Sequence, residues 1–266
     1  MADATRIVTT YTAAADTFDR LPFWHHYGRR TVDLLDLRPG QRVLDLCCGT
    51  GGSAIPAAEK VGSSGQVVGV DLTPALVEQA RAAAATRGFT QATFIAGDVA
   101  ALDYPAASFD AVISVFGLFF LDDMPSTLAR AWSWLSPGGA LGITVWASVN
   151  ISPGEDYFWE AVHRDHPVAS HISPSQRLAP PGALAELFVS AGLDRPRVVT
   201  EPWRMPLATP DDFWPVVMGT SNRGVFAALS PGAQAAVKHE VIERLRRERV
   251  DGLDMAAHIA MARKPG

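Results

Sequence analysis

The chain has 266 residues, of which 48% are hydrophobic and 19% are charged, a composition typical of a globular protein. A chain of this length can bury about 75% of the surface that its unfolded form exposes, so one large core is possible. The formal net charge of −5 provides no general basic field, and we therefore expect no nucleic-acid partner.

The chain contains two cysteines, Cys47 and Cys48, which are adjacent. Vicinal cysteines rarely form a structural disulfide, and no second pair exists to build a disulfide framework or a zinc site. We therefore expect a reducing, cytoplasmic setting and no metal. The N-terminus lacks the pattern of a secretory signal, and no uncharged apolar run reaches membrane length, so we expect no membrane association.

The first 147 residues predict a helical segment followed by alternating strands and helices. Residues 1–38 have an amphipathic helical pattern. Strands are then predicted at 42–47, 66–72, 92–98, 109–117 and 140–147, with helices at 52–61, 73–88 and 125–135 and a turn at 136–139. This alternation is typical of a parallel α/β sheet covered by helices.

The remainder of the chain is less regular. Residues 148–173 are rich in Pro, Ser and His, which favours a loop or lid. A helix is predicted at 180–193, strands at 197–205 and 254–264, and mainly helical structure at 210–250. We therefore expect an N-terminal cap at 1–38 and one doubly wound domain at 39–266, with cap insertions at about 148–178 and 205–250.

A glycine turn follows the first predicted strand and opens a helix. Gly49, Gly51 and Gly52 remove Cβ atoms where a ligand must touch the backbone, and they direct free N–H groups toward it. Together with Ala54, two of these glycines fit the dinucleotide pattern G-x-G-x-x-A. Asp71 ends the second strand, where it can accept hydrogen bonds from ribose hydroxyls. These residues indicate a ligand that contains a nucleoside, but they do not distinguish a dinucleotide from other nucleosides.

Two further acids and the position of the turn favour one class of nucleoside. Asp45 lies just before the turn, where a carboxylate repels a pyrophosphate but suits an ammonium group. Asp98 ends the third strand, where it can accept from the exocyclic amine of adenine. About forty residues precede the turn, whereas a dinucleotide fold often begins near its first strand. A nucleoside that carries an amino acid therefore fits better than a dinucleotide.

At these positions the sequence resembles the class I S-adenosylmethionine-dependent methyltransferases, in the small-molecule branch that contains the ubiquinone and menaquinone biosynthesis enzymes. "VLDLCCGTG" is similar to their first motif, "VVGVDLTPALVEQAR" to the second, and "GDVAALDYPAASFDAVIS" to the third and fourth. The resemblance is dense over 40–147 and continues through 193. It implies a Rossmann-like methyltransferase sheet, mostly parallel with an antiparallel last strand, and S-adenosylmethionine as the cofactor.

The resemblance also implies residues that contact the cofactor at the strand ends and on the N-terminal helix. These are Asp45, Cys47, Gly49 and Gly51 for the methionine end, Asp71 for the ribose, Leu72, Asp98 and Val99 for the adenine, Ser114 and Phe116 for the methionine side, and Tyr11 as an aromatic lid. Cys47 stands where the family usually has its first glycine. We expect a small residue there to be tolerated if its φ is negative, and we expect the cysteines to fill space.

The sequence departs from relatives that methylate hydroxyl groups. Many of those carry a histidine pair soon after the fourth strand, where this chain has Phe119 and Phe120. A general base is required only if the acceptor still holds its proton at neutral pH. His25, His26 and His166, in the predicted cap segments, are the remaining candidates for a catalytic base.

Aromatic residues gather outside the predicted sheet and favour an apolar pocket for a small ligand. The residues expected to line the substrate pocket are Phe18, Trp24, Phe119, Phe120, Trp159 and Trp214. The sequence therefore predicts methyl transfer to a small, largely apolar or aromatic metabolite, with a slight preference for an oxygen acceptor. The alternatives are a cyclase or rearrangement enzyme that retains the cofactor, an NAD-dependent oxidoreductase, and a non-enzymatic protein with the same fold. The oligomeric state stays open.

Overall fold

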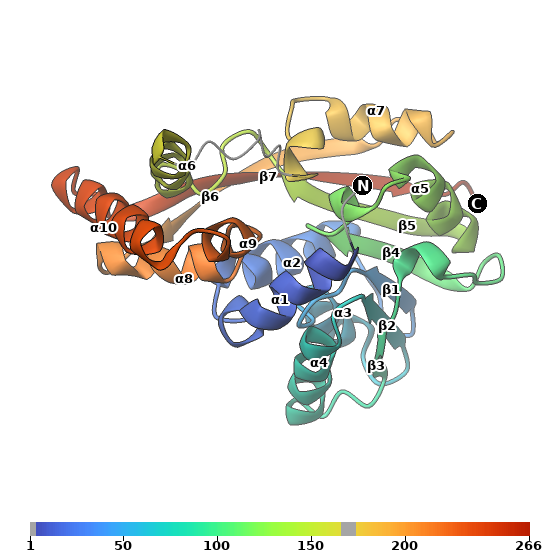
Figure 1. The fold of residues 1–266 in the computed structure, drawn as a ribbon. Helices are drawn as coiled ribbons and strands as arrows, with labels where there is room; N and C mark the ends of the chain where they lie inside the picture. The colour runs from blue at the N-terminus through green and yellow to red at the C-terminus, as the bar shows by residue number, and fades with distance from the viewer. Residues whose placement is uncertain (1–3, 166–173) are drawn as a thin grey trace.

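The computed structural model describes residues 4–165 and 174–266, which form a seven-stranded sheet in the order β3-β2-β1-β4-β5-β7-β6 (Figure 1). The strands are β1 Arg42–Leu46, β2 Gln66–Asp71, β3 Ala92–Ala96, β4 Phe109–Val115, β5 Leu135–Trp146, β6 Arg197–Pro206 and β7 Gly252–Arg263. β1 to β5 are parallel, and β7 runs antiparallel to both of its neighbours. The predicted doubly wound α/β fold is confirmed.

Helices follow the strands in the expected alternation. They are α1 Ala4–Phe18, α2 Pro22–Leu35, α3 Ala54–Val61, α4 Pro74–Thr86, α5 Met124–Trp134, α6 Gly154–Asp165, α7 Ala183–Ser190, α8 Phe213–Met218, α9 Asn222–Ala227 and α10 Pro231–Arg247. Short 3-10 helices are η1 Val99–Ala101, η2 Leu118–Phe120, η3 Pro174–Arg177 and η4 Pro210–Asp212. No helix of the described residues combines the length and the apolar content that a membrane span requires.

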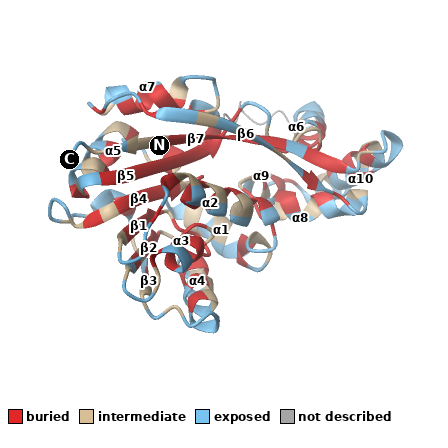
Figure 2. Ribbon diagram, turned by 180° about the vertical axis from the view of Figure 1, so that it is seen from behind, coloured by how far each residue is buried: buried red, intermediate tan, exposed pale blue. Residues whose placement is uncertain are grey.

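Both faces of the central strands β1, β4, β5 and β7 are buried, as their apolar runs require, whereas the edge strands β3 and β6 are largely exposed. Adjacent residues point to opposite faces, so Leu44 and Val112 join a core cluster with α5 and α7, whereas Val43 and Ile113 join one with α3 and α4. Figure 2 shows β4, β5 and β7 as the most continuously buried part of the molecule. The rigid sheet therefore fixes the positions of the loops at its carboxyl edge.

The strand β5 begins earlier than predicted, because the expected turn at 136–139 lies inside it. Phe109 of β4 pairs with Leu135, whereas Ala111 pairs with Ala140. The segment between these pairs forms a bulge, and Gly138 adopts a φ of +77° within it. The Pro-Gly-Gly signal thus marks an irregularity in the strand rather than the end of the element.

The predicted loop at 148–173 is corrected, because residues 154–165 form α6. Acids occupy the first turn of this helix and basic residues its last turn, which complements the helix dipole. Phe158, Ala161 and Val162 are buried at helical spacing. The Pro, Ser and His content suggested a loop, but the helical spacing of apolar residues within 154–165 allows this segment to pack as a helix.

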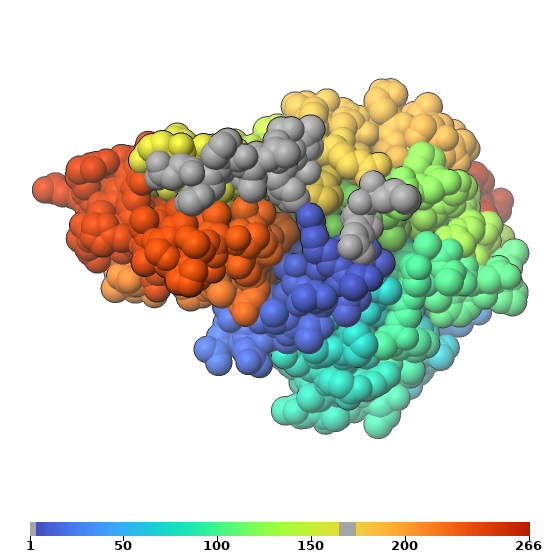
Figure 3. Space-filling view, viewed as in Figure 1, coloured from blue at the N-terminus to red at the C-terminus, as the bar shows by residue number. Residues whose placement is uncertain are grey.

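The N-terminal helix α1 lies between two parts of the molecule that are distant in sequence. It contacts α4 on the glycine-turn side and both α8 and α9 on the other side. Figures 1 and 3 show α1 between the strand–helix half and the C-terminal helices. Helix α6 in turn packs against α10. Helix α1 therefore joins the strand–helix half of the molecule to the helices near its C-terminus.

Candidate active site

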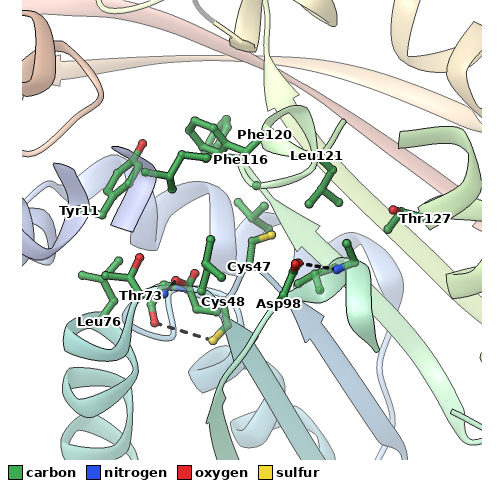
Figure 4. A pocket seen from close by; sticks show the side chains of 18 of the residues that line it. Tyr11, Cys47, Cys48, Thr73, Leu76, Asp98, Phe116, Phe120, Leu121 and Thr127 are labelled. Carbon is green, nitrogen blue, oxygen red and sulfur yellow. Dashed lines mark hydrogen bonds between the residues drawn. The ribbon is translucent and has the colours of Figure 1, made fainter. Parts of the chain in front are cut away.

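A cavity of about 560 Å3 opens at the carboxyl edge of the parallel strands. Sites for small ligands typically have about 300–1,000 Å3. The cavity lies where the strand order reverses, between β1 and β4, which is where doubly wound sheets bind ligands. Figure 4 shows Tyr11 and Phe120 on one side of the cavity and Thr73 and Asp98 on the other.

The glycine turn after β1 brings bare backbone to this cavity. Gly49 and Gly51 adopt φ angles of +54° and +91°, in the left-handed region that glycine occupies without strain. Gly49 and Gly52 line the cavity, whereas Gly51 lies within the turn and does not. Helix α2 fixes the turn from behind, since a Cβ atom on Gly28 would lie 2.2 Å from the carbonyl oxygen of Gly52.

Asp71 connects the glycine turn to the start of α4. Its Oδ2 accepts from the backbone N–H of Gly49 at 2.9 Å, and its Oδ1 accepts from that of Thr73 at 2.8 Å. Burial raises the pKa of the Asp71 carboxyl, and the two N–H donors and the Thr73 hydroxyl oppose that rise. A carboxylate has about four acceptor positions and the Thr73 hydroxyl can rotate to another acceptor, so Asp71 can accept from two ligand hydroxyls. This arrangement suits the diol of a ribose.

Asp98 and Val99 line the cavity beside the end of β3. The Asp98 Oδ1 accepts from the backbone N–H of Ala100 at 2.8 Å and so begins η1. Arg130 of α5 donates to the carbonyl oxygens of Ala100 at 2.9 Å and of Leu102 at 3.3 Å. The loop that would meet the edge of an adenine is therefore held by side-chain contacts on both sides.

Asp45 does not line the cavity, which corrects the expected direct contact with the methionine end. Like Val43 two residues earlier, it points to the face that α3 covers, and its Oδ2 accepts from Ser53 Oγ at 2.7 Å. Its Oδ1 is buried without a hydrogen-bond partner. Burial raises the pKa of the Asp45 carboxyl to about 7. Asp45 thus lies under the glycine turn, poorly solvated and incompletely bonded.

Cys47 lines the cavity with a φ of +58°, so the condition under which we expected a small residue to be tolerated there, a negative φ, is not met. The chain must make the same left-handed turn there that a glycine would make. A Cβ atom on Gly117 would lie 2.2 Å from the Cys47 Cβ, so a glycine opposite makes room for the cysteine. Cys47 and Cys48 are both free, and burial raises the pKa of both thiols. Neither is an activated thiolate.

Aromatic rings from three segments form another side of the cavity. We call this surface the aromatic wall: Tyr11, Phe18, Trp24, Phe116 and Phe120. Tyr11 meets Phe18 and Phe120 edge-on, with ring centroids 5.8 and 5.9 Å apart. Phe116 stacks on Trp146 behind it, with centroids 3.9 Å apart. Such packing presents a rigid apolar surface to a ligand.

Four other predicted residues lie away from this cavity. Ser114 is buried behind it, and Phe119 lines a smaller cavity next to it. Trp159 packs on Phe158, and Trp214 packs on Phe226. The structure thus corrects the placement of Trp159 and Trp214, because each helix turns these rings toward its own neighbours. Leu72, which we expect to pack on the adenine, does line the main cavity.

The histidines His25 and His26 also lie outside the cavity wall. His25 hydrogen bonds through Nε2 with the carbonyl oxygen of Asp19 at 3.0 Å, and its contact with the Asp19 carboxylate raises the pKa of the imidazole. The His26 ring stacks on Trp203 with centroids 4.5 Å apart, and burial lowers the pKa of that imidazole.

The geometry of α2 explains this correction. Successive helical residues point about 100° apart, so a helix that turns Trp24 to the cavity turns His25 and His26 away. His166, the third candidate base, lies outside the described residues. Among the described residues, no group of three or more His, Cys, Asp or Glu side chains could hold a metal ion.

Several residues that line the cavity were not predicted from the sequence: Ala4, Ile7, Thr73, Leu76, Leu121, Thr127 and Arg130. A signal for two of them was present. Ala4, Ile7, Tyr11 and Phe18 have the spacing of one helix face, and that face of α1 is the one that covers the cavity. The others are placed by contacts between elements, which no local pattern encodes.

Comparison with known proteins identifies the family. Residues 43–139 match the family described as methyltransferase domain. The chain is 31% identical to nocamycin O-methyltransferase of Saccharothrix syringae over 84% of each chain. It is 38% identical to aklanonic acid methyltransferase DauC of Streptomyces sp. over 52% of this chain, and it spans 64% of that relative's length.

Further relatives agree with the predicted branch and fold. Demethylmenaquinone methyltransferase of Anoxybacillus flavithermus is 31% identical over 50% of this chain, and the match spans 59% of its length. The YcgJ protein of Bacillus subtilis has the same fold, with a TM-score of 0.58 at 18% identity over 91% of this chain and 99% of that one. The chain belongs to the class I S-adenosylmethionine-dependent methyltransferase family, and its cofactor is S-adenosylmethionine.

Proposed function

We propose that this chain transfers a methyl group to an oxygen atom of a small, largely apolar or aromatic metabolite. The aromatic wall carries the proposal, because an apolar, aromatic surface beside the cofactor residues suits such an acceptor. The name of nocamycin O-methyltransferase supports an oxygen acceptor, and it and aklanonic acid methyltransferase both support a small-molecule substrate. We also propose that the protein has no nucleic-acid partner and that it is cytoplasmic.

The cofactor residues proposed here are those that combine cavity exposure with hydrogen-bonding capacity. The backbone of Cys47 and Gly49 would hold the methionine end, Asp71 the ribose hydroxyls, and Asp98 the adenine edge. When bound, S-adenosylmethionine supplies a methyl group that its sulfonium already activates. The chain therefore contributes binding, orientation of the acceptor and exclusion of water.

The residues that line the cavity determine whether a side chain is available to remove a proton from the acceptor. Among the described residues, neither cavity is lined by a histidine. An acceptor that is already ionised at neutral pH, such as an acidic phenol or a carboxylate, would need no general base. We propose acceptors of this kind for the main cavity.

Calorimetric titration with S-adenosylmethionine, S-adenosylhomocysteine and NAD tests the cofactor assignment first. We expect micromolar binding of both sulfur ligands and no binding of NAD. A screen of phenolic and carboxylate aromatic compounds, scored by mass shift of the acceptor, then tests the acceptor class. Binding of NAD in place of the sulfur ligands would contradict the proposal and favour the oxidoreductase.

The same screen separates methyl transfer from a cyclase or rearrangement on this fold. Methyl transfer produces one S-adenosylhomocysteine for each product, whereas a rearrangement leaves the cofactor intact. Product formation without S-adenosylhomocysteine would overturn the proposed transfer while leaving cofactor binding in place. We expect a ratio of about one, as the balance of a displacement reaction requires.

A further inference from the structure

A second cavity adjoins the aromatic wall. It has a volume of about 30 Å3 and shares Tyr11, Trp24, Phe116 and Phe120 with the main cavity. A single water-sized group needs about 10–15 Å3 of such volume, so this space holds one small polar substituent and no ring. We call it the inner pocket.

Polar groups from four separate segments converge on the inner pocket. They belong to Trp24 of α2, Asn150 after β5, Glu155 of α6 and Thr220 after α8. Three of their atoms are buried without a hydrogen-bond partner: the indole Nε1 of Trp24, Oδ1 of Asn150 and Oγ1 of Thr220. Thr220 is only 7% exposed. Buried polar atoms are nearly always bonded, so three unbonded ones in so small a space point to a ligand group.

The carboxyl of Glu155 is held in place at this pocket. Its Oε1 accepts from Asn222 Nδ2 at 2.9 Å, and the Trp159 side chain also hydrogen bonds with it. Burial raises the pKa of the Glu155 carboxyl, and these two hydrogen bonds oppose that rise. A carboxylate offers about four acceptor positions, so Glu155 can accept another donor.

We propose that the inner pocket recognises a hydroxyl group of the acceptor, at a position other than the atom that is methylated. This inference rests on the proposed function, because it assigns a feature of the same acceptor. The pocket presents acceptor atoms on Glu155 and Asn150, a donor on Trp24 and a hydroxyl on Thr220 that can do either. A carbonyl oxygen would leave the acceptors unbonded, and an ammonium group would leave the indole N–H unbonded. A hydroxyl group can donate a hydrogen bond to the acceptor atoms of the pocket and accept one from the indole N–H.

The pocket also explains how an apolar site could select one aromatic metabolite over another. A buried site that hydrogen bonds a substrate hydroxyl discriminates strongly against an analogue that lacks it, because the polar groups of the site then lose their partner. Contacts with an aromatic wall alone distinguish similar rings weakly. The inner pocket would thus supply selectivity that Tyr11, Phe116 and Phe120 cannot.

The test measures binding of 1-naphthol and naphthalene to the protein loaded with S-adenosylhomocysteine. We expect 1-naphthol to bind more tightly to the wild type. Thr220→Val removes a buried hydroxyl at nearly constant volume and should weaken 1-naphthol binding about tenfold, the effect of one hydrogen bond. Glu155→Gln should weaken it by a similar factor. Binding of naphthalene should change less than about twofold in both variants.

Thr144→Val is the matched control, because Thr144 is also a buried threonine but lines neither the main cavity nor the inner pocket. It should leave the preference for 1-naphthol intact. Equal affinity of the wild type for the two probes, absence of binding included, would overturn the proposal and leave the pocket to an ordered water. An equal loss for both probes in the Thr220 and Glu155 variants would also overturn it, since that indicates a structural role.

These outcomes are separate from failure of the proposed function. The affinity of each variant for S-adenosylhomocysteine is measured first, and we expect it to match that of the wild type. Absence of that binding in the wild type would contradict the cofactor assignment itself. Normal cofactor binding with no preference for the hydroxyl would overturn only the role of the inner pocket.

Discussion

The two sides of the cavity are built in different ways. The cofactor side consists of polar groups at the ends of neighbouring strands, and backbone N–H donors hold its central acid, Asp71. The acceptor side consists of rings from α1, α2 and the segment after β4, held by packing such as that of Phe116 on Trp146. One side therefore depends on local backbone conformation, and the other depends on contacts between segments distant in the chain.

This difference separates two kinds of function in one cavity. Strand ends fixed by a sheet place ligand-binding groups reproducibly, which suits a cofactor of constant shape. Rings contributed by caps can be exchanged without altering the sheet, which suits an acceptor that differs between enzymes. Mutations on the two sides should accordingly affect different ligands.

The largest expected effect tests the cofactor side. Asp71→Ala removes a carboxylate that we expect to accept two ribose hydroxyls, and hydrogen bonds to charged groups contribute about 1.5–3 kcal/mol each. Affinity for S-adenosylhomocysteine should therefore fall by at least about 100-fold. Isothermal titration calorimetry measures this loss.

Asp110→Ala is the control for Asp71→Ala. Asp110 also holds backbone, accepting from the N–H of Arg42 at 2.8 Å, but it does not line the cavity. Its removal should leave cofactor affinity unchanged. Equal losses in the two variants would mean that Asp71 acts through stability and not through contact with the ribose.

The next largest effect concerns Asp45, the acid beneath the cofactor side. Its pKa is about 7 in the folded protein, raised from 3.8 chiefly by burial, so its contribution to stability is fully present below about pH 4 and is lost as the pH rises through 7. Between pH 5 and pH 8, the free energy of unfolding of the wild type should fall relative to Asp45→Asn by about 1–3 kcal/mol.

Chemical denaturation at several pH values measures that difference. Each curve should be taken without cofactor, because a bound ammonium group would favour the ionised carboxylate. Parallel pH profiles for the wild type and Asp45→Asn would contradict the prediction and indicate a carboxylate that is already ionised at pH 5. Such a result would mean that the Asp45 carboxyl is ionised in the folded protein at neutral pH, as a solvent-accessible acid would be.

The parts of the fold that the sequence predicted are those with strong local signals. Apolar β-branched runs bounded by turns identified β1 to β5, and Pro74 with the preceding strand end identified α4. Helix α6 was missed because Pro, Ser and His around it suggested a loop. The bulge at 136–139 was missed because it depends on pairing between β4 and β5, which composition does not encode.

Prediction of the site follows the same division. Asp71, Leu72, Asp98 and Val99 follow strand ends, and the structure brings all of them to the cavity. The orientation of a ring on a cap helix depends on its neighbours, so Trp159 and Trp214 were placed in the pocket incorrectly. The inner pocket was not foreseen, because its polar groups converge only through the packing of α2, α6 and α8.

A smaller effect concerns the strain of the glycine turn. Left-handed backbone costs a residue with a side chain roughly 1–2 kcal/mol, and Cys47 adopts it with a φ of +58°. Cys47→Gly should remove this strain and, after the loss of side-chain packing, raise the free energy of unfolding by about 0.5–1 kcal/mol. Cys48→Gly, at the next position, should lower it. Destabilisation of equal size in both variants would show that packing of the thiol outweighs the strain.

The smallest expected effect tests whether the acceptor side contains a histidine base. His25 lies beside Asp19 and His26 stacks on Trp203, so neither ring reaches a described cavity. Turnover of His25→Ala and His26→Ala should therefore stay within about twofold of the wild type, whereas general acid–base catalysis typically contributes about 100- to 10,000-fold. For His166→Ala we expect the same result on the proposal that the acceptor arrives ionised. A thousandfold loss in one variant would assign that histidine to proton transfer. Preserved turnover in all three would mean that the acceptor arrives ionised, and selectivity would then depend on the aromatic wall and the inner pocket.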